Sequence, residues 1–132
     1  MDPVVHFEMP YEDSARVITF YSTVFGWKLE KLGADMGDYV VATTADRDVR
    51  PGIPAGAIGG GFFPKRPDGP QSPSVVVGVE DIRATMNKIT QAGGRVLGEP
   101  MSIPGVGDYV QFLDTEGNQA SILQPSPMPS HS

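Results

Sequence analysis

A histidine and a glutamate, His6 and Glu8, stand two residues apart near the start of the chain. They belong to the run Val4–Met9, whose β-branched and aromatic residues predict a strand. Side chains two positions apart on a strand point to the same face, so the imidazole and the carboxylate should lie together. Such a pair could serve as an acid–base couple near neutral pH, or it could form a structural ion pair. A histidine satisfied within the core is an equally open alternative for His6.

The rest of the composition excludes several kinds of chemistry. The 132-residue chain has no cysteine, which rules out thiolate nucleophiles, zinc–thiolate sites and disulfides. It has no Gly-x-Ser-x-Gly motif, and Gly59–Gly61 is not followed by the Lys-Ser/Thr of a phosphate-binding loop. The net charge of -6 argues against nucleic-acid binding, and no apolar run approaches the roughly 20 residues of a membrane span. We therefore expect a cytoplasmic protein with neither a nucleic-acid nor a membrane partner.

The elements that position His6 occur twice in the chain. At one offset of 68 residues the identical pairs include Glu12 and Glu80, Asp13 and Asp81, and Gly26 and Gly94. The same offset places Ser74 where the first half has His6. The string Gly37–Val40 recurs as Gly107–Val110 at an offset of 70 residues, so the duplication continues beyond the first helix. Internal repeats of this kind indicate two copies of one structural unit.

Hydrophobic periodicity and turn residues predict the order β-α-β-β-β in each half. In the first half, a helix over Asp13–Phe25 follows the first strand, and further strands are expected at 27–32, 38–42 and 57–63. In the second half, a helix with Ile82, Met86 and Ile89 on its buried face follows a strand at 74–79. A short strand at 95–97, a strand from 107 and a last strand at 119–123 complete this half, with a turn over Asp114–Asn118.

The predicted domain organisation follows from this repeat. A first module covers residues 1–63, a proline-rich linker 64–73, a second module 74–124 and a disordered tail 125–132, and the two modules together make one domain. Residues 44–56 are expected to form a loop. The linker has proline at every third position, which is typical of an extended spacer and offers an SH3-type ligand as the alternative. Glycines inside a strand, as at Gly59–Gly61, mark a bulge or a close approach to the backbone, with a flexible turn as the alternative.

Several strings resemble the vicinal oxygen chelate superfamily, which includes glyoxalase I, bleomycin-resistance proteins and extradiol dioxygenases. They are Val5-His6-Phe7, Phe20-Tyr21 with Phe25-Gly26-Trp27, Ala92-Gly93-Gly94, and the turn at Phe112–Asn118. The string His6–Pro10, with Ile103–Gly107, is most similar to the branch described as predicted enzymes related to lactoylglutathione lyase. The resemblance spans residues 4 to 125. It implies an α+β fold in which two tandem βαβββ modules form a curled mixed sheet around a cleft.

The resemblance also implies where a metal site would be. In the metal-dependent members each module contributes one ligand from its first strand and one from its last, and the four positions fall here on His6, Gly60, Ser74 and Ser121. Glycine offers no side-chain donor, and a neutral serine hydroxyl is a poor ligand beside histidine or carboxylate. We therefore expect no metal of the family type and no other cofactor, with a divalent metal bound in another way as the alternative.

Strand alternation, combined with this resemblance, predicts the residues that line the cleft. They are His6 and Glu8 together with Gly60, Phe62, Ser74, Val76, Gln119, Ser121 and Leu123. One imidazole, one carboxylate, small residues and apolar walls suit a small organic ligand. Tyr39 and Tyr109 occupy equivalent positions of the repeat, and we expect both to serve in packing.

Three functions are compatible with this cleft. The first is a metal-free small-molecule-binding protein that works as the bleomycin-resistance branch does. The second is a lyase or isomerase of glyoxalase I type that uses His6 and Glu8, with or without a divalent metal. The third is an assembly or regulatory domain whose cleft is vestigial. The resemblance further implies a homodimer, with the clefts formed within one chain or between two.

Overall fold

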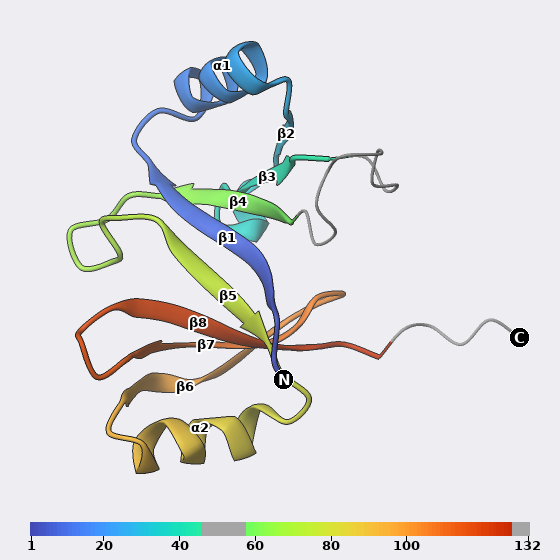
Figure 1. Cartoon of the computed structure of the whole chain (residues 1–132). Coiled ribbons are helices and arrows are strands. Elements are labelled where there is room, and N and C mark those ends of the chain that lie inside the picture. Colours follow the sequence, from blue (N-terminus) through green and yellow to red (C-terminus); the bar gives the residue numbers. More distant parts are fainter. Residues whose placement is uncertain (46–57, 128–132) are drawn as a thin grey trace, which may run out of the picture. The chain divides into compact units, whose positions relative to one another are not determined.

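The computed structural model describes residues 1–45 and 58–127, so the predicted loop over 44–56 and the predicted tail over 125–132 lie largely outside the described residues. The chain divides into two compact units, Val5–Ser74 and Val75–Ser132 with Met1–Val4. Each contains the elements of one β-α-β-β-β module, which confirms the expected α+β fold of two tandem modules (Figure 1). In the described part of the chain no helix is long and apolar enough to cross a membrane.

The first module is built on a four-stranded mixed sheet. Its strands are β1 (Val4–Tyr11), β2 (Lys28–Lys31), β3 (Val40–Thr43) and β4 (Gly59–Pro64), in the order β2-β3-β4-β1, and a 3-10 helix, η1 (Ala34–Met36), lies between β2 and β3 in the chain. β1 and β4 run parallel, and the other neighbours are antiparallel. The register pairs His6 with Gly59 and Glu8 with Gly61. The side chains of paired residues point to the same face, so this register decides what shares a face with His6.

Helix α1 (Ser14–Phe25) covers one face of this sheet (Figure 1). It begins after Asp13, whose carboxylate accepts a hydrogen bond from the Arg16 amide at 3.1 Å, as expected of an N-cap residue. It ends at Gly26, which adopts the left-handed conformation (φ 72°) that glycine tolerates best. The core beneath the helix consists of Tyr11, Val40, Ala42 and Phe62, with Phe7, Met9, Val17, Ile18, Tyr21, Trp27 and Leu29 packed around them.

The second module repeats this arrangement. Its elements are β5 (Ser74–Gly78), α2 (Ile82–Gln91), β6 (Arg95–Ile103), β7 (Gly107–Leu113) and β8 (Gln119–Pro125), and the strand order β5-β8-β7-β6 is that of the first module. α2 packs on a core of Val79, Ile82, Val110 and Ile122. The expectation of a short strand at 95–97 is wrong, because β6 continues to Ile103 through an irregularity between Leu97 and Met101. Pro125, assigned from sequence to the tail, belongs to β8.

The hairpin between β7 and β8 closes at the predicted turn over Asp114–Asn118. The Asp114 carboxylate accepts hydrogen bonds from the Asn118 side-chain amide at 3.0 Å, the Asn118 backbone at 2.9 Å and the Glu116 backbone at 2.8 Å. These donors stabilise the charged form and lower the pKa of Asp114, the Asn118 side chain most of all. Gly117 has the positive φ (81°) that the turn requires.

Candidate functional site

A tyrosine joins His6 to Glu8. The Nε2 atom of His6 lies 2.9 Å from the hydroxyl of Tyr39, and that hydroxyl donates to Oε2 of Glu8 at 3.1 Å. His6 and Glu8 project from β1, and Tyr39 immediately precedes β3. The imidazole and phenol rings are nearly parallel, with centroids 6.5 Å apart and an interplanar angle of 17°. Imidazole, phenol and carboxylate therefore form one hydrogen-bonded chain on one face of the first module's sheet.

The direction of these bonds fixes the protons. A phenol has a single proton to donate. Because Tyr39 gives that proton to Glu8, its oxygen must accept from His6, which places the imidazole proton on Nε2. The Nδ1 atom of His6 then carries a lone pair, and among the described residues it makes no hydrogen bond. Nδ1 of His6 can therefore accept a proton or a hydrogen bond from a ligand.

Burial sets the charge of the imidazole. Desolvation lowers the pKa of His6 below its usual value of 6.5, and the nearby Glu8 carboxylate opposes this shift only in part. The ring is therefore neutral at pH 7. A neutral imidazole next to a carboxylate, with a phenol between them, can accept a proton at Nδ1 and stabilise the resulting charge through the chain.

This lowered pKa predicts how stability depends on pH. As the pH falls below about 6.5, the unfolded chain binds a proton that folded His6 does not, so the free energy of unfolding should fall until the pH passes below the lowered pKa. His6→Gln should remove this contribution to the fall in the free energy of unfolding at acid pH. Melting temperatures of the wild type and the variant, measured between about pH 5 and 8, check this. The matched control is His131→Gln, which changes the other histidine of the chain; equal acid sensitivity of the wild type and His6→Gln would contradict the expectation.

The glycine triplet of β4 accommodates two aromatic rings. A Cβ atom at Gly61 would overlap the ring and hydroxyl of Tyr39, and one at Gly60 would overlap the ring of Phe7. A close approach to the backbone was one of the two sequence interpretations of this triplet, and it is confirmed. Glycine at Gly61 is therefore what allows Tyr39 to reach His6 and Glu8.

The expected position of Gly60 and Phe62 on the face of His6 and Glu8 is wrong by one residue. The register pairs Phe7 with Gly60 and Met9 with Phe62, so both lie on the face that α1 covers, where Phe62 is only 1% exposed. The residues of β4 on the face of His6 are Gly59, Gly61 and Phe63. A run of three glycines has no hydrophobic period, so the sequence could not show which of them faces His6.

The second module has a related tyrosine contact. The hydroxyl of Tyr109 lies 2.7 Å from Oγ of Ser121, which pairs across β5 and β8 with Val76. Ser121 and Val76 are each 2% exposed, whereas Ser74 and Gln119 are half-buried. The four residues share one face by strand alternation, and of these Ser74 and Gln119 are the polar groups that a ligand could reach.

The sequence analysis expects Tyr39 and Tyr109 to serve in packing, and the structure adds hydrogen bonds made by both hydroxyls. Each tyrosine hydrogen-bonds a residue that the sequence had already selected for the site: His6 and Glu8 in one module, Ser121 in the other. The signal that could have found them is the string Gly-Asp-Tyr-Val, present in both halves.

The donors at this site do not fit a metal centre of the family type. Nε2 of His6 and the Glu8 carboxylate are both engaged with the Tyr39 hydroxyl, and Oγ of Ser121 with Tyr109. Gly59 and Gly61 provide no side-chain donor. Over residues 1–45 and 58–127, no group of three or more His, Cys, Asp or Glu side chains is placed to hold a metal ion. His6, Tyr39 and Glu8 are joined on this face by hydrogen bonds through which a proton could be shared.

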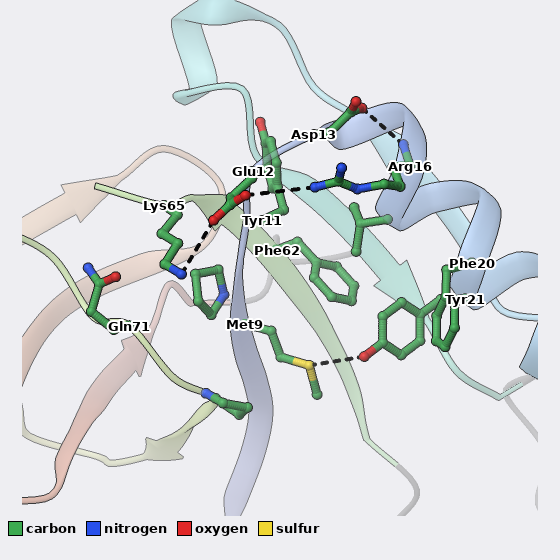
Figure 2. Close-up of a pocket in the computed structure, with 13 residues that line it drawn as sticks. Met9, Tyr11, Glu12, Asp13, Arg16, Phe20, Tyr21, Phe62, Lys65 and Gln71 are labelled. Atoms are coloured by element: carbon green, nitrogen blue, oxygen red, sulfur yellow. Dashed lines mark hydrogen bonds and ion pairs between the residues drawn. The ribbon is translucent and has the colours of Figure 1, made fainter. Parts of the chain in front are cut away.

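A groove of about 520 Å³ lies on the other face of the first module's sheet (Figure 2). It runs along α1 and β1 and is lined by Met9, Pro10, Tyr11, Glu12, Asp13, Arg16, Val17, Phe20, Tyr21, Phe62, Lys65, Gln71 and Pro73. Because Met9 and Phe62 belong to the face that α1 covers, the groove is separate from the chain of His6, Tyr39 and Glu8.

Comparison with known proteins identifies the family. The model of the Glyoxalase/Bleomycin resistance protein/Dioxygenase superfamily matches residues 4–122. The chain belongs to this superfamily. It is 32% identical over 111 residues to CFP32 of Mycobacterium bovis, a protein named provisionally as a glyoxylase; the match covers 83% of the chain but 39% of that relative. It is also 32% identical over 119 residues to a glyoxylase-like domain-containing protein of Didymella fabae, covering 87% of the chain and 88% of the relative.

Solved structures show the same fold. A hypothetical protein from Bacillus halodurans superposes with a TM-score of 0.68 at 12% identity, covering 98% of this chain and 99% of that one. Methylmalonyl-CoA epimerase from Mycobacterium tuberculosis gives 0.65 at 16% identity, covering 94% and 88%. A variant of the Streptomyces coelicolor epimerase in complex with 2-nitronate-propionyl-CoA gives 0.66 at 19% identity, covering 98% of both chains. At these identities the comparison shows that the chain shares the fold of these proteins. The match to the superfamily model confirms the resemblance to the vicinal oxygen chelate superfamily.

Proposed function

We propose that this superfamily member binds a small organic molecule on the face of its first module that carries His6, Tyr39 and Glu8, without a metal ion held by these residues. One observation carries the proposal. The Tyr39 hydroxyl joins Nε2 of His6 to Glu8, so the groups that would otherwise ligate an ion satisfy each other. Membership of a superfamily that includes bleomycin-resistance proteins supports a binding role.

The geometry limits the chemistry of this ligand. Nδ1 of neutral His6 accepts a hydrogen bond, so the ligand should present an O–H or N–H donor there. We also propose that the chain acts as a homodimer, because Val24 and Phe25 at the end of α1 are 54% and 60% exposed and a second copy could cover them.

A ligand screen tests the binding proposal. Native mass spectrometry of the untagged chain, incubated with a defined library of metabolites and antibiotics that includes metal-free bleomycin, should detect at least one compound retained without added metal. The compound should be lost in His6→Gln, because the glutamine side chain does not present the Nδ1 acceptor. Retention should be unchanged in Glu116→Gln, an exposed change in the turn between β7 and β8. If no compound in the library is retained, or if His6→Gln retains it equally, the proposal is wrong.

A second candidate function is a lyase or isomerase of glyoxalase I type. It is favoured by the lowered pKa of His6, which leaves Nδ1 free to accept a proton at neutral pH, and by the hydrogen-bonded path from His6 through Tyr39 to Glu8. The names of two relatives, a glyoxylase and a glyoxylase-like protein, also support this second candidate.

A further inference from the structure

We propose that the groove along α1 and β1 is a second binding site, and that it takes a small aromatic monocarboxylate. The site lies on the opposite face of the sheet from His6, Tyr39 and Glu8, and it is independent of ligand binding at those residues. Its volume of about 520 Å³ falls within the range of small-molecule sites.

The floor of the groove is apolar and aromatic. Met9, Phe62 and Tyr21 form it, and Phe20 stands at its edge with 53% of its surface exposed (Figure 2). A ring lying against Phe20 and Tyr21 would cover apolar surface that the chain leaves in water, and aromatic rings pair favourably with such neighbours. The body of the ligand is therefore aromatic.

One hydroxyl in this apolar floor has a weak partner. The hydroxyl of Tyr21 donates to the thioether sulfur of Met9 at 3.6 Å. Within the described residues this hydroxyl makes no other hydrogen bond. Sulfur in a thioether is a weak acceptor. A ligand oxygen would be a better one, so the ligand should place an oxygen within reach of Tyr21.

Two cations at the rim share one carboxylate. Arg16 and Lys65 approach Glu12 at 3.8 and 3.5 Å, and Figure 2 shows both pairs at the mouth of the groove. These separations exceed the roughly 2.7–2.9 Å of a close charge-assisted hydrogen bond, so both cations keep donors for a ligand carboxylate. A single ligand carboxylate can share these donors with Glu12, whereas a second negative charge on the ligand would be opposed by Glu12 and the N-cap Asp13.

The second module lacks these features at the equivalent positions. At the offset of 68 residues, the positions equivalent to Phe20, Tyr21 and Arg16 are occupied by Lys88, Ile89 and Ala84, respectively. The two modules share one fold, so the groove chemistry is a property of the first module's side chains and not of the fold.

The test uses 2-naphthylacetate and, as its uncharged counterpart, 2-naphthaleneethanol. The full chain is labelled with ¹³C at its methionine methyl groups, and the Met9 signal is assigned with Met9→Leu. We expect 2-naphthylacetate to shift the Met9 signal saturably and the alcohol to bind more weakly. Tyr21→Phe should weaken binding about fivefold, the effect of one ordinary hydrogen bond, and Lys65→Gln about threefold.

The control is Arg83→Gln, which removes a comparable exposed ion pair with Glu99 in the second module and should leave the affinity unchanged. An unchanged Met9 signal at millimolar 2-naphthylacetate would overturn the site. Equal affinity for the acid and the alcohol, unaffected by Lys65→Gln, would overturn the assignment of a carboxylate. Neither result would bear on ligand binding at His6, which the library screen with His6→Gln measures separately.

Discussion

Gly61→Ala is expected to lower the free energy of unfolding by about 3 kcal/mol, from overpacking together with the loss of the Tyr39 hydrogen bonds. The new methyl group would overlap the ring and hydroxyl of Tyr39. β4 cannot move aside, because Gly61 is paired with Glu8 on one neighbouring strand and Val41 on the other. The tyrosine must therefore leave its position and lose its bonds to His6 and Glu8. Urea denaturation followed by the fluorescence of Trp27 measures the change.

A second variant background separates this mechanism from a general intolerance of the strand. With Tyr39→Ala the space that the ring occupied is free, so adding Gly61→Ala should lower the free energy of unfolding by less than about 1 kcal/mol. The effects of the two changes on the free energy of unfolding should therefore be strongly non-additive. Gly59→Ala on the same strand and face is the matched control, since its Cβ would stand 3.1 Å from the Ala42 carbonyl and need only a small adjustment. If Gly61→Ala costs the same with and without Tyr39, the ring does not explain the glycine.

Glu8→Gln should abolish proton transfer if the site is catalytic, lowering turnover at least about 100-fold. Glutamine can still accept the hydrogen bond from Tyr39 through its side-chain carbonyl, so the chain of contacts is preserved. It cannot compensate the positive charge that His6 acquires when Nδ1 accepts a proton. The assay follows the isomerisation of the hemithioacetal of methylglyoxal and glutathione, and the melting temperature is measured in parallel.

The same variant also distinguishes the two candidate functions. Activity in the wild type that Glu8→Gln removes while the melting temperature is nearly unchanged would support the lyase or isomerase. Glu116→Gln changes the same residue type in the turn between β7 and β8 and should leave activity as it is. Full activity in Glu8→Gln would show that the carboxylate has no catalytic role. Absence of turnover in the wild type would leave small-molecule binding as the function of this face.

Much of the fold could be predicted from the sequence, because the repeat is visible as matched residues. Identical caps at Asp13 and Asp81 and the glycines that follow each helix marked two copies of one unit. The period of a strand placed His6 and Glu8 on one face, and their common contact with Tyr39 agrees with this placement. β6 was underestimated because Gly98 and Pro100 interrupt its pattern.

The candidate site could be predicted only in part. The sequence placed Tyr39 in a predicted strand over 38–42, whereas β3 begins at Val40, and the alternation of one strand does not show which side chains of another strand it meets. The residues of β4 that share a face with His6 are decided by the register between β4 and β1. Three successive glycines give no hydrophobic pattern from which this register could be predicted. The groove brings Lys65, in the predicted linker, next to Glu12, which lies between β1 and α1, and only the folded chain brings these distant residues together.

Metal content is the most direct test of whether His6, Tyr39 and Glu8 form a metal-free site. It is measured by plasma mass spectrometry on the chain purified without a histidine tag or chelator. We predict far less than one equivalent of divalent metal per chain, even after incubation with nickel, zinc or manganese, because His6 and Glu8 are engaged with Tyr39. Close to one equivalent, lost in His6→Ala, would contradict this and show that these residues hold a metal after all.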